Sequence, residues 1–431
     1  MKDSPYQKSK GKRPPKRRVV VTGIGAITPL GHSMDITWDG IVNGRTPASP
    51  IQYFDASEFP NRIAYQVTDF SLSRKLLKDG EDAYLCECAE FAVNAAEEAL
   101  EQSGLLGSSR PETTNPNRIQ VCFGMGLPSP NIDWYEKVFF PKKLSLEESL
   151  NNARILPDQI SSIIARMVGA RGGISTVHTA CASSGQALGE AYESIAYGDA
   201  DLVVTGGADS MISPFYAAGF ALLGALSKRN DDPKTASRPF DRNRDGFVFG
   251  EGACVLVFEE YDHACKRGAL ILGEVCGYGI TESAYRITDL HPEGTGPIEA
   301  MQMALDDANL KPTDIGYINA HGTSTQLNDR IESLAISKVF GPFSKDTLVS
   351  STKSMTGHTI SAAGALEFAF CLLALRHQTL PPSVNISSFD TDCLITLTAP
   401  EAQPRNFRFA LSNSVGFGGS NTALIAGRIG R

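Results

Sequence analysis

The sequence lacks any run of about 18 or more apolar residues, so we expect no transmembrane helix. Its N-terminus is basic and has no apolar core segment. That composition excludes a secretory signal and predicts a disordered lead-in over residues 1–17. The nine cysteines are scattered and odd in number, which excludes a simple disulfide framework and indicates a reducing, cytoplasmic compartment.

Charge is unevenly distributed along the chain. The net charge is −8, whereas residues 1–18 contain eight Lys or Arg and one Asp, or +7. The rest of the chain therefore carries −15, the difference between these two values. A body this acidic argues against nucleic acid as the main partner, although a local basic patch for an acidic carrier protein is compatible with it.

Apolar runs and helical spacing alternate along the chain and predict an α/β fold with buried, largely parallel sheets. The first strand is expected to end in a tight turn at Gly23 and Gly25, and a later strand at Gly206 and Gly207. The predicted strands cover residues 18–24, 119–123, 175–180, 202–204, 253–258, 315–320, 348–351 and 423–426. The predicted helices cover residues 84–100, the segment after 180, 298–308, 331–339 and 362–375.

Three motifs resemble cofactor or metal sites but do not complete them. Residues 23–28 begin like a dinucleotide fingerprint, but Thr28 replaces its third glycine. Residues 241–246 begin like a calcium loop, but its twelfth position is Gly252 instead of glutamate. Cys86 and Cys88 are expected on different faces of a helix, with no second Cys or His pair for zinc. We therefore predict no metal site.

Three other segments place reactive side chains at predicted strand ends. Cys181 lies where a strand turns into a helix, and the helix dipole there stabilises a thiolate. His321 follows a strand and precedes Gly and hydroxyl residues; Lys353 and His358 follow another strand. Taken alone, Cys181 is more typical of packing, and Lys353 and His358 of a surface charge and a helix cap, whereas His321 suits function and structure equally. Together they suit acyl transfer to a thiolate and stabilisation of an enolate oxygen by two imidazoles.

These segments resemble the beta-ketoacyl-acyl-carrier-protein synthases, the elongating condensing enzymes with a Cys-His-His triad. The resemblance runs from about Arg18 to Ile425, nearly the whole body. Its further motifs are VVTGIG at 20–25, AYGDAD at 196–201, SRPFD at 237–241 and GFGGSN at 416–421.

The resemblance assigns expected roles to individual residues. Cys181 would be the nucleophile, while His321 and His358 would bind the thioester carbonyl and assist decarboxylation. Lys353 would polarise the site, paired with Glu332. The backbone amides of Cys181 and Phe417 would form the oxyanion hole, with Phe417 as the acyl-pocket gate. Three further residues are expected to contact the substrate. Thr323 and Thr325 would lie at the phosphopantetheine arm, and Leu127 at the bottom of the acyl pocket.

The resemblance also implies a thiolase-like fold of two similar α/β halves in five α-β-α-β-α layers, usually dimeric. We place the nucleophile half at 18–265 and the histidine half at 266–431. The implied partner is acyl-carrier protein, whose phosphopantetheine arm brings the substrate, with no other cofactor. A docking patch is expected at Lys75, Lys78, Lys228 and Arg229, for which a solvated surface is the alternative interpretation.

Departures from the family pattern leave the pathway open. Residue 415 is Val where many fatty-acid relatives have Phe, and residues 326–330 look more like aromatic-polyketide ketosynthases. Both fatty-acid and polyketide or polyene synthesis are therefore compatible with the chain. Three alternative functions are a catalytic subunit obligately paired with a chain-length-factor subunit, a coenzyme A thiolase, and a start-unit synthase. His358 argues against the last, because those enzymes have Asn there.

Overall fold

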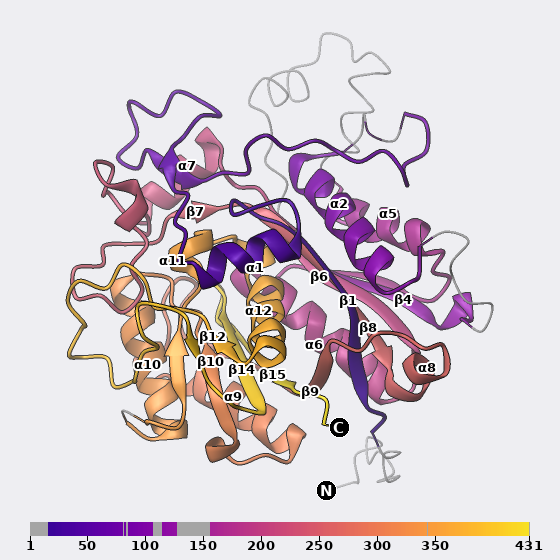
Figure 1. Cartoon of the computed structure of the whole chain (residues 1–431). Helices are drawn as coiled ribbons and strands as arrows, with labels where there is room; N and C mark the ends of the chain where they lie inside the picture. The colour runs from indigo at the N-terminus through magenta and orange to yellow at the C-terminus, as the bar shows by residue number, and fades with distance from the viewer. Residues whose placement is uncertain are drawn as a thin grey trace, which may run out of the picture.

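The computed structural model describes residues 16–80, 82, 85–106, 114–126, 156–342 and 344–430. Within these residues, ten strands join into one sheet in the order β11-β10-β14-β15-β9-β1-β8-β6-β4-β5 (Figure 1). The first-half strands are β1 (Val19–Ile27), β4 (Ile119–Met125), β5 (Ile174–Val177), β6 (Leu202–Asp209) and β8 (Gly252–Glu260). The second-half strands are β9 (Gly273–Glu282), β10 (Ile315–Asn319), β11 (Leu348–Ser350), β14 (Phe409–Val415) and β15 (Ser420–Gly427).

The two halves of this sheet have the same topology. Going outward from the middle, β1-β8-β6-β4-β5 are joined by two antiparallel and then two parallel pairings. The strands β9-β15-β14-β10-β11 repeat that sequence of pairings. Each half therefore uses its strands in the same order, and an antiparallel pairing of β1 with β9 joins the two.

The expectation of largely parallel sheets is wrong, because the strands in the middle of the sheet pair antiparallel and only those toward its two edges pair parallel. One reason is local. Only Gly416 to Gly419 separate β14 from β15, and a connection this short joins neighbouring strands in opposite directions. The alternation of strands and helices in the sequence carried no information about this hairpin.

Helices cover both faces of the curved sheet and fill the space between its halves, which gives the predicted five layers. One outer layer is formed by α2 (Glu87–Gln102) and α5 (Gln159–Val168), which pack on the first half. The middle layer is α6 (Ser183–Ala196) with α12 (Ala363–His377). The other outer layer contains α9 (Thr295–Ala308), packed on β9 and β15, and α10 (Gln326–Phe340) beside it. The pairs of helices occupy separate levels in Figure 1.

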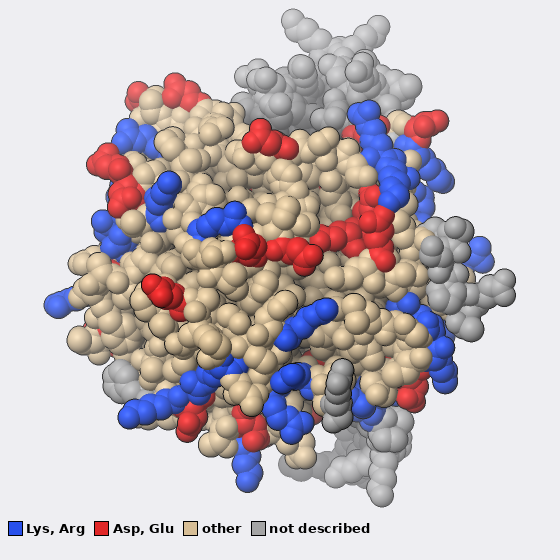
Figure 2. Space-filling model, viewed as in Figure 1, with Lys and Arg blue, Asp and Glu red and all other residues tan. Residues whose placement is uncertain are grey.

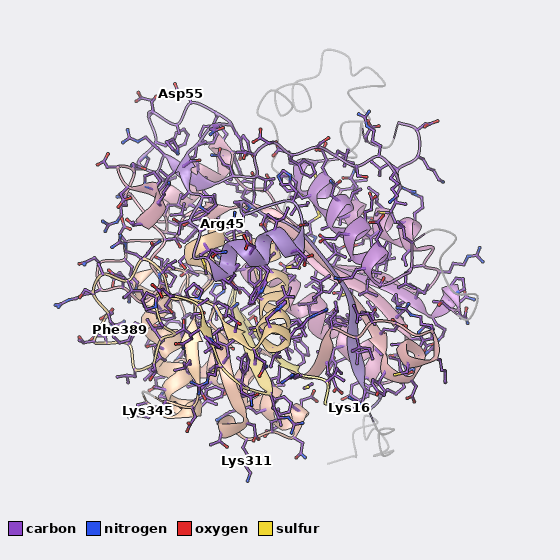
Figure 3. All side chains as sticks on the ribbon, viewed as in Figure 1. Lys16, Arg45, Asp55, Lys311, Lys345 and Phe389 are labelled. Carbon is purple, nitrogen blue, oxygen red and sulfur yellow. The ribbon has the colours of Figure 1, made fainter. Side chains whose placement is uncertain are left out.

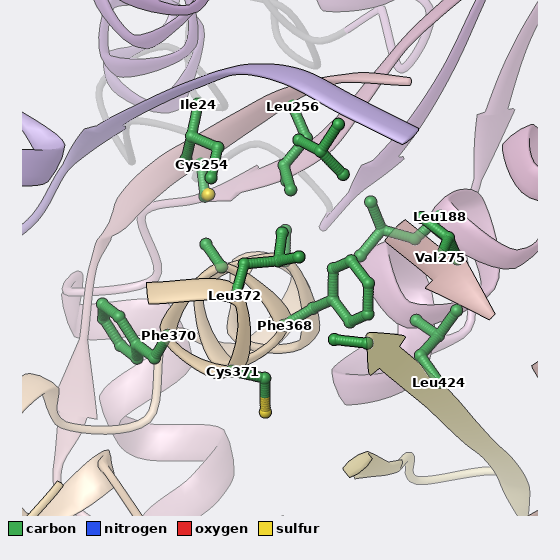
Figure 4. Packing of buried hydrophobic residues seen from close by; sticks show 14 of the residues in the cluster. Ile24, Leu188, Cys254, Leu256, Val275, Phe368, Phe370, Cys371, Leu372 and Leu424 are labelled. Atoms are coloured by element: carbon green, nitrogen blue, oxygen red, sulfur yellow. The ribbon is translucent and has the colours of Figure 1, made fainter. Parts of the chain in front are cut away.

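Helix α12 is the centre of the core. Its Leu372 points toward β8, where Cys254 and Leu256 lie, while Phe368 points toward the side where Leu188 of α6 and Leu424 of β15 lie (Figure 4). Because both faces of this helix are covered, it is apolar around its circumference from Ala363 to Leu375, with Glu367 as the exception. The helical stretch Ile360–His377 is long and apolar enough to cross a membrane by composition, although 89% of it is buried inside the protein, as in a soluble core helix.

Four glycines let the outer helices approach their strands closely. A Cβ on Gly23 or Gly25 of β1 would overlap the carbonyl oxygens of α2, and one on Gly277 or Gly279 of β9 would overlap those of α9. The predicted turn at Gly23 and Gly25 is therefore wrong, since β1 continues to Ile27. The predicted strand end at Gly206 and Gly207 is wrong for a related reason: β6 continues to Asp209 between tightly packed neighbours.

Smaller elements complete the molecule. The helices are α1 (Met34–Val42), α7 (Pro214–Leu222), α8 (Tyr261–Lys266) and α11 (Lys353–Thr356). The short strands are β2 (Ser49–Pro50), β3 (Ile63–Tyr65) and β7 (Phe249–Gly250), with β12 (Thr379–Leu380) and β13 (Gln403–Pro404). The proposed boundary between residues 265 and 266 falls within α8, between β8 and β9. It remains a proposal, and most of the predicted lead-in 1–17 lies outside the described residues.

Charges of both signs are spread over the face of the molecule that Figure 2 shows. In Figure 2, Asp and Glu form a row across the middle of the visible face, with Lys and Arg mainly around its edges. Exposed cations such as Lys311 and Lys345 extend from the periphery in Figure 3. The reactive side chains, in contrast, lie inside the protein.

Candidate active site

Cys181 lies in a sharp turn between β5 and α6. The short 3₁₀ segment Ala180–Ala182 leads into the helix, and Ala180 has φ of 50°. A residue with a Cβ adopts this left-handed conformation only when its surroundings impose it. The turn directs the thiol into a pocket, where the backbone N–H groups of Cys181 and Phe417 point at the sulfur. These are the two amides that the resemblance assigns to the oxyanion hole, a role that stays a prediction.

The pocket brings together residues from both halves of the chain. Its lining includes Cys181, His321, His358, Thr323, Thr325 and Phe417, together with Ile287–Leu290, Leu327 and Asn328. Lys353 and Glu332 lie behind this lining and are fully buried. Leu127 lies outside the described residues, so its predicted place at the pocket bottom stays a prediction.

Both imidazoles are held so that Nε2 carries the hydrogen. The His358 Nδ1 atom accepts the backbone N–H of Ile360 at 3.3 Å, and its Nε2 lies 3.1 Å from the Cys181 sulfur. The His321 Nδ1 atom lies 3.3 Å from the Lys353 ammonium, which can only donate. Because a neutral imidazole has one N–H, both rings present an Nε2–H donor to the pocket. The two rings stand edge to face, with centroids 5.3 Å apart.

Cys181, His321 and His358 also have donor atoms within 4.8 Å of one another, close enough to be considered as a metal site. A metal ligand needs a free lone pair, however, and in both rings the outward Nε2 carries hydrogen when Nδ1 accepts. The fixed donors at Nδ1 thus favour N–H donation to an oxygen or sulfur over ligation of a cation.

Lys353 does not pair with Glu332 as predicted. Its ammonium forms an ion pair with Glu367 of α12 and donates to the carbonyl oxygen of His321 at 2.6 Å. With the contact to the His321 ring, these bonds account for its three N–H groups. Glu332 is occupied elsewhere, since its carboxylate accepts the backbone N–H groups of His321 and Gly322, each at 2.7 Å.

Burial determines the protonation of these groups. It raises the pKa of the Cys181 thiol to about 12, while the Lys353 ammonium and the two amides act in the opposite direction. Burial and the same ammonium lower the pKa of His321 and His358 well below its usual range. The site therefore rests with a thiol and two neutral imidazoles, in agreement with the tautomers that the hydrogen bonds define.

Aromatic rings shape the pocket around Phe417. The ring of Phe417 stacks on Phe220 of α7, with centroids 6.1 Å apart and an interplanar angle of 25°. Phe220 in turn contacts Phe247, which packs edge to face on the His358 ring. Thr323 and Thr325, also in the pocket lining, form a hydroxyl pair at 2.9 Å. The pocket lining thus combines aromatic rings beside His358 with a pair of hydroxyl groups.

The structure separates the four residues predicted to dock a carrier protein. Lys75 forms ion pairs with Glu97 and Glu101 of α2, so neighbouring carboxylates already balance its charge. Lys78 lies in the segment before α2. Lys228 and Arg229 follow Ser227, whose N–H bonds the carbonyl of Phe247 in the pocket wall. Through Ser227, this second pair is linked to the wall of the pocket.

Sequence reasoning missed Glu367, Ile360, Phe220 and Phe247. The signal for Glu367 was available, because a single carboxylate inside an otherwise apolar helix must have a buried partner. Ile360 acts through its backbone N–H, which the identity of the side chain does not reveal. Phe220 and Phe247 stand in apolar stretches of the sequence, which packing in the core explains equally well.

A buried thiol, two N–H-donating imidazoles and a pocket reached from outside define an enzyme that transfers acyl groups, on a duplicated five-layer fold. Comparisons with known proteins agree. The model of the beta-ketoacyl synthase N-terminal domain matches residues 16–264, and that of the C-terminal domain matches residues 272–387. The chain belongs to the beta-ketoacyl synthase family, and the resemblance found in its motifs is confirmed.

Individual relatives come from both branches of this family. The 3-oxoacyl-acyl-carrier-protein synthase 2 of Coxiella burnetii is 39% identical over 428 residues, covering 96% of this chain and 99% of that protein. A putative polyketide beta-ketoacyl synthase 1 of Streptomyces cyaneus is 39% identical over 427 residues, covering 96% and 99%. The solved ishigamide ketosynthase/chain length factor has a TM-score of 0.87 and 32% identity, covering 96% of this chain and 100% of that chain. The predicted thiolase-like fold is thereby confirmed.

Alkylation of Cys181 by iodoacetamide should become faster with rising pH between about pH 7 and 9. The reason is that a thiol with a pKa near 12 gains thiolate about tenfold per pH unit below that value. The measurement is peptide mass spectrometry of Cys181 over time. Lys353→Met should slow the reaction, whereas Lys311→Met at the surface should not. A rate independent of pH in this range would show that the sulfur already rests as thiolate.

Glu367→Leu should destabilise the protein by about 3–5 kcal/mol, because it leaves the buried Lys353 ammonium without its counterion. The double variant Lys353→Met/Glu367→Leu should recover much of that loss, since both charges are then gone. Denaturant unfolding of the wild type, both single variants and the double variant gives the coupling. Strictly additive effects would contradict the pairing.

Proposed function

We propose that the chain catalyses acyl transfer to Cys181 followed by decarboxylative condensation with a malonyl thioester, each substrate carried by acyl-carrier protein. The observation that carries the proposal is the convergence of N–H donors on one sulfur. The His358 Nε2 atom is 3.1 Å away, and two backbone amides point at the same atom. Such donors stabilise negative charge on a thiolate and on the oxygen of an attacked thioester.

In the first step, the Cys181 sulfur attacks the carbonyl carbon of the acyl thioester. Its proton leaves with the phosphopantetheine thiol, which is the leaving group. The amides of Cys181 and Phe417 hold the oxyanion of the intermediate. The phosphopantetheine arm would lie beside the hydroxyls of Thr323 and Thr325.

In the second step, a malonyl thioester loses CO2, and the electron pair of the broken C–C bond becomes an enolate. The Nε2–H groups of His321 and His358 would donate to the enolate oxygen, since both point into the same pocket. The enolate carbon then attacks the Cys181 thioester and releases the thiolate, leaving a chain longer by two carbons. Lys353 would act through His321, by holding its tautomer.

The proposal covers fatty-acyl and polyketide chains, and it assigns docking of the acidic carrier to Lys228 and Arg229, which are linked to the pocket wall through Ser227. Lys78 remains a further candidate, whereas Lys75 is already paired with carboxylates. A coenzyme A thiolase is the less favoured alternative. Its second reactive cysteine would have to be Cys393, which is buried in a core cluster formed largely by the second half and is not among the pocket residues.

Intact-mass analysis after mixing with acylated carrier protein should show one acyl adduct on the wild type and none on Cys181→Ala. His321→Ala and His358→Ala should keep an adduct but release CO2 from malonyl-carrier protein about 10²–10³-fold more slowly, because each removes one oxyanion donor. His32→Ala, outside the pocket, is the matched control. Equal adducts on wild type and Cys181→Ala would overturn the nucleophile assignment, and product analysis then separates fatty-acid from polyketide chains.

A second subunit also belongs to the proposal. Strand β5 forms one edge of the sheet, and its Ile174 is 46% exposed. The apolar helix α7 leaves Phe215 and Leu222 exposed, with Leu223 just beyond its end. Open strand edges and clustered apolar side chains are features of a subunit interface. The similar ishigamide structure pairs a ketosynthase with a chain length factor.

Sedimentation of the purified chain distinguishes the two kinds of partner. A mass of two copies, reduced to one by Ile174→Lys, would identify a homodimer through this edge, because a charge there opposes pairing of two strands. A monomer that becomes active only with a chain-length-factor subunit would identify the heterodimer. Lys311→Glu, on the exposed surface, should leave the mass unchanged. A stable, fully active monomer would contradict the proposed interface.

A further inference from the structure

A second pair of thiols lies outside the pocket, at the beginning of α2. The sulfur atoms of Cys86 and Cys88 are 3.4 Å apart. The expectation that they lie on different faces of a helix is wrong, because Cys86 is the N-cap residue and has extended backbone angles, φ −81° and ψ 163°. Its side chain therefore turns back over the first turn of the helix and meets Cys88 there.

The two thiols differ in access and in charge. Cys86 is half-buried, whereas Cys88 is 5% exposed. The Cys88 thiol and the backbone N–H of Ala89 donate to the Cys86 sulfur and lower its pKa, as expected at the positive end of a helix. The same interaction, together with burial, raises the pKa of Cys88. The pair thus combines an accessible nucleophilic sulfur with a protonated one in contact with it.

We propose that Cys86 and Cys88 form a reversible disulfide under oxidising conditions and that its closure lowers the condensing activity. With a small-molecule disulfide as oxidant, the Cys86 thiolate attacks one sulfur and releases one thiol. Cys88 then loses its proton to solvent and attacks the Cys86 sulfur of the mixed disulfide, releasing the second thiol. Two electrons pass to the oxidant. A bond that spans a single residue gains little loop entropy, which suits a switch better than a structural cross-link.

The first turn of α2 is connected to the pocket through hydrogen bonds. A carboxylate oxygen of Glu87, between the two cysteines, lies 3.0 Å from the Ser210 hydroxyl, which the buried Glu251 carboxylate shares at 2.8 Å. The preceding Asp209 accepts the backbone N–H of Ser361 at 3.0 Å. Ser361 follows Ile360, whose N–H holds the ring of the pocket histidine His358.

Closing the disulfide requires the sulfur atoms to approach from 3.4 Å to about 2.05 Å, and coupling to the pocket requires that the first turn of α2 shifts with them. That turn carries Glu87, the first residue in the route to Ile360. The predicted result is a weaker orientation of the His358 N–H donor. Cys181 itself is deeply buried, so an oxidant in solution should meet Cys86 first.

To test this, the protein is treated with oxidised glutathione, and its remaining thiols are blocked with iodoacetamide. The tryptic peptides are then mapped by mass spectrometry. The peptide from Asp79 to Arg118 holds Cys86 and Cys88 and no other cysteine. We expect this peptide to lose two hydrogens and escape alkylation, while Cys181 still accepts an acyl group in the intact-mass assay. Condensation should fall several-fold and return after reduction with dithiothreitol.

Two variants test whether the loss of activity depends on Cys86. Cys86→Ser should retain its activity under oxidant, whereas Cys265→Ser, at the exposed cysteine, should lose activity as the wild type does. If both thiols of the pair stay reduced while Cys265 is glutathionylated, the disulfide assignment is overturned. If the disulfide forms without loss of activity, or if Cys86→Ser loses activity equally, the coupling to the pocket is overturned. The mass readout does not depend on the condensing reaction.

Discussion

The buried ammonium of Lys353 connects the parts of the site. One nitrogen atom bonds the backbone carbonyl of His321, contacts its ring and pairs with Glu367. His321 follows strand β10, Glu367 lies on the central helix α12, and Lys353 itself begins the short helix α11, so a single ion pair and its hydrogen bonds hold three elements together. A lone charge inside a protein would be costly, and this one is tolerated because each of its N–H groups has a partner.

The duplicated fold uses one turn for two purposes. Ala180 and Ile360 both have positive φ, 50° and 45°, and each opens a 3₁₀ segment that leads into a middle-layer helix. In the first half the turn presents Cys181 to the pocket. In the second half it presents a backbone N–H to His358. The strain of a left-handed residue is thus present twice, each time where the site needs a group held in one orientation.

The sequence was sufficient to predict the features that depend on local pattern. Most strands and helices of both halves, and the three motifs around Cys181, His321 and His358, follow from apolar runs and residue types. The strands β9 and β14 and the helix α5 were not predicted. Other errors arose where packing decides: Gly23 and Gly25 lie inside a strand and let a helix approach it, and Lys353 pairs with Glu367 of α12 instead of Glu332. Such contacts join residues far apart in the chain, and no local pattern encodes them.

Burial gives the site its chemistry and also limits its stability toward acid. Desolvation keeps His321 and His358 neutral in the folded protein, with pKa values well below the value of about 6.5 that unfolded chains show. The unfolded state therefore binds protons first. The contribution of these residues to stability is complete above that pH and decreases as the pH falls below it. The same neutral rings are what a developing oxyanion requires, since each presents an N–H without carrying a charge that would have to be desolvated. Catalytic geometry and acid sensitivity are thus two consequences of one burial.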